Sequence, residues 1–162
     1  MSDGLSPQST IEVDRTTATR SLGDLGESLA AKFLVENGYR IVVSNFKVPV
    51  GRNRKGVQVT GEIDIIALDG ETLVFIEVKT RRSDDFTPVL TAVNTRKQRQ
   101  ITRTAKMYQK IFNVRDMPHR YDVVTVLAPL HAEPSIEITK SFWTESNFRK
   151  RTWRQAVWRD FV

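Results

Sequence analysis

The chain has 162 residues, of which 40% are hydrophobic and 27% are charged, so it can bury one hydrophobic core of ordinary size. It contains no cysteine, which excludes a disulfide framework and thiolate chemistry and fits a reducing cytoplasm. Its formal net charge of +6 favours a polyanionic partner, with nucleic acid ahead of an anionic membrane surface.

The N-terminal part of the chain changes from polar to amphipathic. Residues 1–19 are polar and rich in Ser and Thr, which predicts a disordered lead-in, and they lack the basic and apolar segments of a signal peptide. Residues 21–37 carry apolar side chains at helical spacing and are followed by Gly38, which predicts a first helix. Residues 39–48 predict a strand, and residues 48–60 a basic loop that can also be the tip of a long hairpin.

The rest of the chain alternates strands and helices. Strands are predicted at 63–68, 73–78, 121–127 and 136–139, and helices at 95–112 and 145–161, with a polar connection over 82–94. This order predicts an α/β fold with a central mixed β-sheet flanked by helices. We divide the chain into the lead-in 1–19, one domain over 20–142, and a basic C-terminal helical extension over 143–162. No apolar run reaches membrane-spanning length, so we expect a cytoplasmic protein without a membrane segment.

Three charged residues interrupt the two apolar strands around Asp69-Gly70. They are Asp64 in the first strand and Glu77 and Lys79 in the second. If Asp69-Gly70 forms a two-residue turn, Glu77 becomes the diagonal neighbour of Asp64 on the same face, about 7–8 Å away between Cα atoms. Lys79 points to the same side because side chains alternate along a strand.

Buried charges are costly unless they are paired or bind a metal. Asp64 and Glu77, with the carbonyl of Val78 as third ligand, are therefore predicted to hold Mg²⁺ or Mn²⁺, which prefer oxygen ligands. Lys79 would orient a water or stabilise charge on a phosphate. Taken one at a time, each of these residues is better explained by a structural ion pair, as we expect for Asp122, with Arg120 as its partner. The three together, in one hairpin of a basic protein, favour a metal site.

The sequence resembles the YraN family of bacterial proteins, which is related to Holliday junction resolvases within the PD-(D/E)xK superfamily. The matching pieces are GDLGESLAAKFLVENGYRIV, GEIDIIALDGETLVFIEVKTR, TAVNTRKQRQITRTAKMY and RYDVVTVL, over residues 23–127. The resemblance implies a restriction-endonuclease-like core, with Asp64 and Glu77 as metal ligands and Lys79 as the catalytic lysine. It also implies that Glu27 is an additional acid near the metal, although helix patterning equally allows a solvated glutamate there.

Basic residues near these motifs are predicted to contact nucleic acid, and their alternative is a solvated helix face or strand edge. They are Arg52, Arg54, Lys55, Arg81, Arg82, Lys97, Arg99 and Arg103. We therefore expect a metal-dependent endonuclease acting on DNA, with branched and single-stranded forms as candidate substrates and a homodimer as a candidate assembly. The rivals are a non-catalytic nucleic-acid-binding module and a DNA-processing adaptor on the same fold.

Overall fold

The computed structural model describes residues 8–82 and 93–148, with side chains described from residue 21 onward. The elements in chain order are α1 (Gln8–Glu36), β1 (Arg40–Arg52), β2 (Gln58–Asp69), β3 (Thr72–Arg81), α3 (Thr95–Ile111), β4 (His119–Leu127), β5 (Ser135–Trp143) and the short 3₁₀ helix η1 (Glu145–Phe148). This confirms the predicted order, and α3 agrees closely with the helix predicted over residues 95–112.

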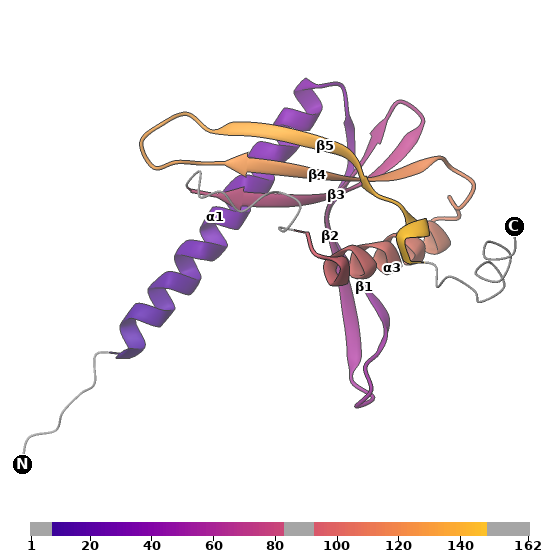
Figure 1. The fold of residues 1–162 in the computed structure, drawn as a ribbon, viewed down its shortest axis with the longest axis horizontal. Coiled ribbons are helices and arrows are strands. Elements are labelled where there is room, and N and C mark those ends of the chain that lie inside the picture. The colour runs from indigo at the N-terminus through magenta and orange to yellow at the C-terminus, as the bar shows by residue number, and fades with distance from the viewer. Residues whose placement is uncertain (1–7, 83–92, 149–162) are drawn as a thin grey trace, which may run out of the picture.

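The strands form one five-stranded sheet in the order β1-β2-β3-β4-β5. Neighbouring strands are antiparallel except β3 and β4, which are parallel and are connected through α3. The predicted α/β fold with a mixed sheet and flanking helices is therefore confirmed. Figure 1 shows the hairpin of β1 and β2 projecting well beyond the rest of the sheet, next to α3.

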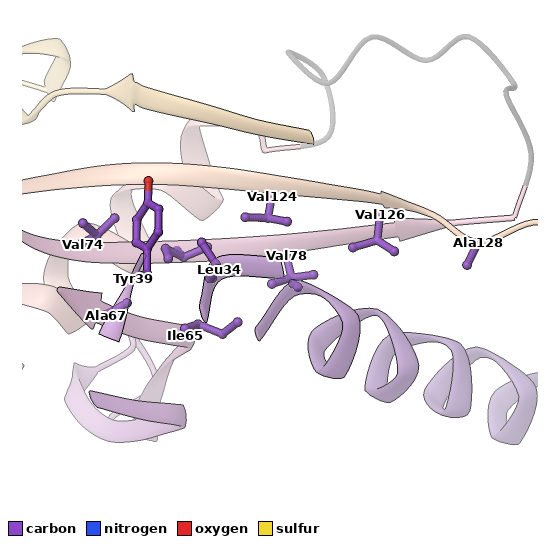
Figure 2. Packing of buried hydrophobic residues seen from close by; sticks show 11 residues of the cluster. Leu34, Tyr39, Ile65, Ala67, Val74, Val78, Val124, Val126 and Ala128 are labelled. Carbon is purple, nitrogen blue, oxygen red and sulfur yellow. The ribbon is translucent and has the colours of Figure 1, made fainter. Parts of the chain in front are cut away.

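One face of the sheet packs against α1. Val74, Ile76 and Val78 of β3 point to this face, in agreement with the two-residue period of a strand. Figure 2 shows this cluster of eleven buried residues, which are Ala30, Leu34, Tyr39, Ile65, Ala67, Val74, Ile76, Val78, Val124, Val126 and Ala128. Ala30 and Leu34, which belong to the apolar stripe predicted for the first helix, are the members of this cluster that come from α1.

The other face of the sheet packs against α3 and is rich in aromatic side chains. Leu73 and Phe75 of β3 point to this face, between the residues that face α1. The ring of Phe75 lies 5.9 Å from that of Tyr108 on α3 and stacks at 5.7 Å on Tyr121 of β4. Offset and edge-to-face ring contacts at these separations add to the free energy of burial. Glu77 follows Phe75 by two residues, so it also belongs to the α3 side.

The first helix is longer than predicted. It begins at Gln8 instead of Ser21, so residues 8–19, which we predicted to be a disordered lead-in, are helical. Residues 8–22 contain no Gly or Pro, which are the residue types that most disfavour a helix interior. The helix can therefore run without interruption as far as Gly23. The apolar stripe marks only the part of a helix that packs, and Figure 1 shows the N-terminal part of α1 extending away from the sheet.

The central turn also differs from the prediction. Asp69 pairs with Thr72, so the two-residue turn is Gly70-Glu71 and not Asp69-Gly70. Gly70 has φ +59°, and the first central residue of a type II′ turn is the position that requires glycine. The predicted register was therefore wrong by two residues on the second strand, because Leu68 pairs with Leu73 and not with Glu71. Pairing ends at Ile65 and Ile76. Extending this register by one residue would place Asp64 directly opposite Glu77 and not diagonal to it.

The basic loop predicted over residues 48–60 is mostly strand. β1 and β2 run to Arg52 and from Gln58, so only residues 53–57 connect them, which confirms the hairpin alternative. Asn53 holds this turn, because its Oδ1 accepts the N–H groups of Lys55 and Val57. Of the helix predicted over 145–161, residues 145–148 form η1, and the remainder lies outside the described residues.

Candidate functional site

Glu77 is the most buried charged group among the three predicted site residues, with 2% of its surface exposed. Lys79 Nζ donates a hydrogen bond of 2.7 Å to Glu77 Oε1. Lys97 Nζ on α3 lies 3.3 Å from Glu77 Oε2, at an angle that makes an ion pair but no hydrogen bond. Glu77 therefore lies between two ammonium groups and retains one buried oxygen without a hydrogen-bond donor, which is an oxygen available to a further ligand.

Asp64 lies on β2, beside Glu77, and is half-buried. Its Oδ2 accepts a 2.7 Å hydrogen bond from the backbone N–H of Val78, just beyond the last β2–β3 pair. Burial first and the negative charge of Glu77 second raise the pKa of Asp64 to about 7, against the hydrogen bond from Val78 and the charge of Lys97, which lower it. The two carboxylates are therefore close enough to repel, and a cation bound between them would favour the ionised form of both.

Glu27 approaches the same charges from α1. Burial raises the pKa of this half-buried carboxyl, a side-chain hydrogen bond with Asn45 lowers it, and nearby carboxylates including Glu77 raise it. Within the described residues, however, no three acidic or histidine side chains gather closely enough to form a metal-ligand cluster. Glu27 thus contributes to the electrostatics of the site, while Asp64 and Glu77 alone are its paired carboxylates.

The position of α1 over β3 depends on a glycine next to Glu27. A methyl group added at Gly26 would overlap Thr80 Oγ1, and the Cβ and Cγ2 atoms of Thr80 would lie 2.7 Å from it. Gly26 therefore lets the helix backbone approach the strand closely. Because Glu27 follows Gly26 directly, this contact also sets how near the Glu27 carboxyl lies to the carboxylates of the sheet.

The predicted basic residues fall into separate groups. Arg54 and Lys55 lie in the exposed turn of the β1–β2 hairpin, and Arg81 and Arg82 lie at and just after the end of β3. Lys97, which we predicted to contact a phosphate, forms an ion pair with Glu77. Sequence reasoning missed this ion pair because the pairing of α3 with β3 is not a local property of the sequence.

Arg52, Arg99 and Arg103 meet at a cleft between the hairpin and α3. The cleft measures about 460 Å³ and is lined by Val50, Gly51, Arg52, Asn53, Val59, Arg96, Arg99, Gln100 and Arg103. Arg96 belongs to the same basic run of the sequence, from Lys79 to Lys106, and residues 96, 99 and 103 share one face of a helix.

Comparison with known proteins identifies the family. A model described as Uncharacterised protein family UPF0102 matches residues 26–126, which is more than half of the chain. The chain belongs to the UPF0102 family. The resemblance to the YraN family is thereby confirmed, and the matched segment contains the three charged hairpin residues, Glu27 and the arginines of the cleft.

Several bacterial UPF0102 proteins are similar over most of the chain. The protein of Geotalea uraniireducens is 41% identical over 121 residues, which cover 75% of this chain and 87% of the relative. The protein of Chlorobium limicola is 44% identical over 108 residues, covering 67% and 76%, and that of Renibacterium salmoninarum is 40% identical over 116 residues, covering 72% and 90%.

A search of solved structures gives a weaker likeness. The chain matches a structure titled "Crystal structure of SSO0001" with a TM-score of 0.38 and 14% identity, over 80% of this chain and 55% of the other. At these values the likeness supports no conclusion about the site. Across residues 8–82 and 93–148, no helix combines the length and apolarity needed to cross a bilayer.

Proposed function

We propose that this UPF0102 protein is a metal-dependent endonuclease that hydrolyses phosphodiester bonds in DNA. The observation that supports this best is the placement of Asp64 beside the buried Glu77, with the ammonium groups of Lys79 and Lys97 converging on the same carboxylate. Two carboxylates and two cations in one half-buried site match the needs of phosphoryl chemistry, which are charge neutralisation and a positioned water.

The donor set fits a hard divalent cation. Glu77 Oε2 is buried without a hydrogen-bond donor, and the pKa of Asp64 is raised to about 7 by burial and by Glu77. Mg²⁺ is commonly held by one or two carboxylates together with waters and substrate phosphates, so two acids suffice. Asp64, Glu77 and the Val78 carbonyl would hold Mg²⁺ or Mn²⁺, and the bound ion would supply Lewis acidity at a phosphate and acidify a water.

Lys79 and Lys97 have different roles in the proposed site. Lys79 is about one-third exposed, so its ammonium lies at the edge of the site where a phosphate can reach it. There it would hold the water or stabilise the charge that develops on the phosphate oxygens. Lys97 reaches Glu77 from α3 and would orient this carboxylate through their ion pair, which is the role of a positioning residue.

A second candidate function is nucleic-acid binding without catalysis. The observation in its favour is that Glu77 already has two cationic partners, so the buried charge is compensated without a metal ion. In that case Asp64, Glu77 and the lysines would be a structural network, and the basic surface alone would carry the function. The two candidates differ in what Lys79 does.

The test is single-turnover cleavage beside equilibrium binding, both with Mn²⁺, over linear, flap and four-way-junction DNA. Lys79→Ala should lower the cleavage rate about 10²–10⁴-fold, the usual contribution of a group that acts in the transition state. DNA affinity should change little, because one phosphate contact among many is a small part of binding. Lys79→Arg should rescue poorly, since guanidinium is bulkier and stays protonated.

The matched control is Lys110→Ala, which removes an exposed lysine at the last turn of α3. This variant should cleave like the wild type. If the wild type binds DNA but cuts no substrate of the panel, and Lys79→Ala only weakens binding, the binding-module candidate replaces the nuclease.

A further inference from the structure

The cleft between the hairpin and α3 has arginines on both of its walls. Arg52 belongs to the β1 side, and Arg96, Arg99 and Arg103 belong to α3. No Asp or Glu is among its nine lining residues. Four like charges around one concave space raise its positive potential, because low-dielectric walls focus the field. An anion is the ligand that such a space would take.

These charges have no acidic partners within the part of the chain that the structure describes. The contacts of Arg52 and Arg99 are neutral: Arg52 Nη1 donates to the carbonyl of Gly56 at 2.7 Å, and the Arg99 guanidinium lies 5.6 Å above the ring of Phe148. Such contacts hold a guanidinium in place without neutralising it. By contrast, the described ion pairs of Lys79, Lys97 and Arg120 compensate buried acids.

The spacing on α3 suits a row of phosphates. Residues 96, 99 and 103 are three and four residues apart, so they lie along one face of the helix. At 1.5 Å per residue they span about 10 Å along the helix, so their guanidinium groups can reach more than one phosphate of the same strand. The opposite wall carries Arg52, so a strand in the cleft would meet cations on two sides. A volume of about 460 Å³ is in the range of small-ligand pockets, which suits a few nucleotides of one strand.

The cleft is connected to the carboxylates through the first turn of α3. Lys97 pairs with Glu77, and the next residue towards the N-terminus, Arg96, lines the cleft. We propose that this cleft binds the phosphates of single-stranded DNA and delivers the strand to the Asp64–Glu77 pair. Delivery rests on the nuclease function proposed above, whereas binding of the strand does not.

The experiment measures fluorescence anisotropy of a labelled single strand and of the blunt duplex of the same sequence, in EDTA so that no cleavage occurs. The full chain is compared with the triple variant Arg96→Gln/Arg99→Gln/Arg103→Gln. Losing three contacts should weaken single-strand binding about 10²-fold at roughly 0.1 M salt, and should make the log–log salt slope less steep by about 2. Duplex binding should change less.

The control triple variant Arg40→Gln/Lys110→Gln/Arg115→Gln removes the same charge from exposed residues outside the cleft, and should keep single-strand affinity within a few-fold. Thermal unfolding checks that each variant folds. If the cleft triple is unstable, Arg96→Gln/Arg103→Gln avoids the Phe148 contact of Arg99 and should still weaken single-strand binding about 25-fold at roughly 0.1 M salt.

Equal losses in the cleft and control variants would overturn the proposal, because they would show a diffuse charge effect. A larger loss for duplex than for single strand, or a wild type that binds no single strand, would also overturn it. Single-strand binding that the cleft variant loses, together with no cleavage in Mn²⁺ by the wild type, would support the cleft as a strand-binding site and would contradict the nuclease function and the delivery that rests on it.

Discussion

At the scale of single residues, the main feature is a pair of carboxylates in unequal environments. Glu77 is almost fully buried and has two ammonium partners, while Asp64 is half-buried and accepts a backbone N–H. Their surroundings differ, because two ammonium groups compensate the charge of Glu77, whereas burial disfavours the ionised form of Asp64. The carboxyl of Asp64 is therefore the group whose charge should respond to pH and to a bound cation.

Asp64→Asn tests this response through stability. The folded-state pKa of about 7 exceeds the ordinary value of 3.8, so the folded protein binds more protons than the unfolded chain between these values, and its stability falls as pH rises through that window. Asn keeps an oxygen for the Val78 N–H and has no charge. In EDTA at about pH 8 the variant should therefore unfold a few degrees higher than the wild type, with a gap that closes towards about pH 4.

Mn²⁺ should change the difference in Tm between the wild type and Asp64→Asn. A cation that binds only the folded wild type raises its Tm by mass action, so the wild type should gain stability with Mn²⁺ and Asp64→Asn should not. An equal Mn²⁺ response of both proteins would remove Asp64 from the metal site. An EDTA gap that does not vary with pH would show that the Asp64 carboxyl titrates normally.

At the scale of elements, the contact between α1 and β3 determines where the acid of the helix lies. Gly26 is buried against Thr80, whereas Gly23, one turn earlier in the same helix, has no atom within 4 Å of the position where a Cβ would stand. The two glycines therefore offer a matched pair. One is required by packing, and the other only lowers the helix propensity of α1.

Gly26→Ala should lower the free energy of unfolding by about 1–3 kcal/mol, the usual cost of overpacking. Gly23→Ala should raise it by about 0.5–1 kcal/mol, the gain from replacing Gly with Ala inside a helix. Urea denaturation of both variants measures the difference. Gly26→Ala/Thr80→Ala should recover part of the loss, because two of the three overlapping atoms belong to the Thr80 hydroxyl and methyl groups. Equal effects of the two glycine substitutions would show that α1 does not pack closely on β3.

At the scale of the whole molecule, an ion-pair network joins distant parts of the sheet. Arg120 Nε donates to both oxygens of Asp122 at 3.1 and 3.0 Å, and its Nη2 donates to Asp69 at 2.7 Å and to the hydroxyl of Tyr39 at 3.0 Å. Asp122 also accepts the backbone N–H of Ser141 at 2.8 Å. The network confirms the predicted pairing of Asp122 with Arg120 and extends it to β2, β5 and the segment after α1.

Asp122→Ala should lower the free energy of unfolding by about 3–5 kcal/mol, because it removes one partner of a buried pair and leaves the Nε of Arg120 and the N–H of Ser141 without an acceptor. Asp122→Asn should cost less, since its oxygen can still accept the N–H of Ser141. Asp116→Ala, at an exposed residue, should stay within about 0.5 kcal/mol. A loss no larger than that of the control would show that the network does not contribute to stability.

The sequence by itself determined the elements and the chemistry of the site. Apolar periodicity is local, so it located α3, the central strands and the inward face of α1. Charged residues inside apolar strands are costly, so Asp64, Glu77 and Lys79 stood out without any structure. The pairing of Asp122 with Arg120 was also predictable, because the two residues lie two apart on one strand.

Tertiary structure decided the relations between elements. The turn at Gly70-Glu71 sets the register of β2 and β3, and Asp69 remains in the strand, where Arg120 holds it. Helix docking brings Lys97 to Glu77, and the length of the β1–β2 hairpin places Arg52 opposite the arginines of α3. Periodicity specifies which face a side chain occupies, but its partner across the sheet or on a helix depends on how distant segments pack.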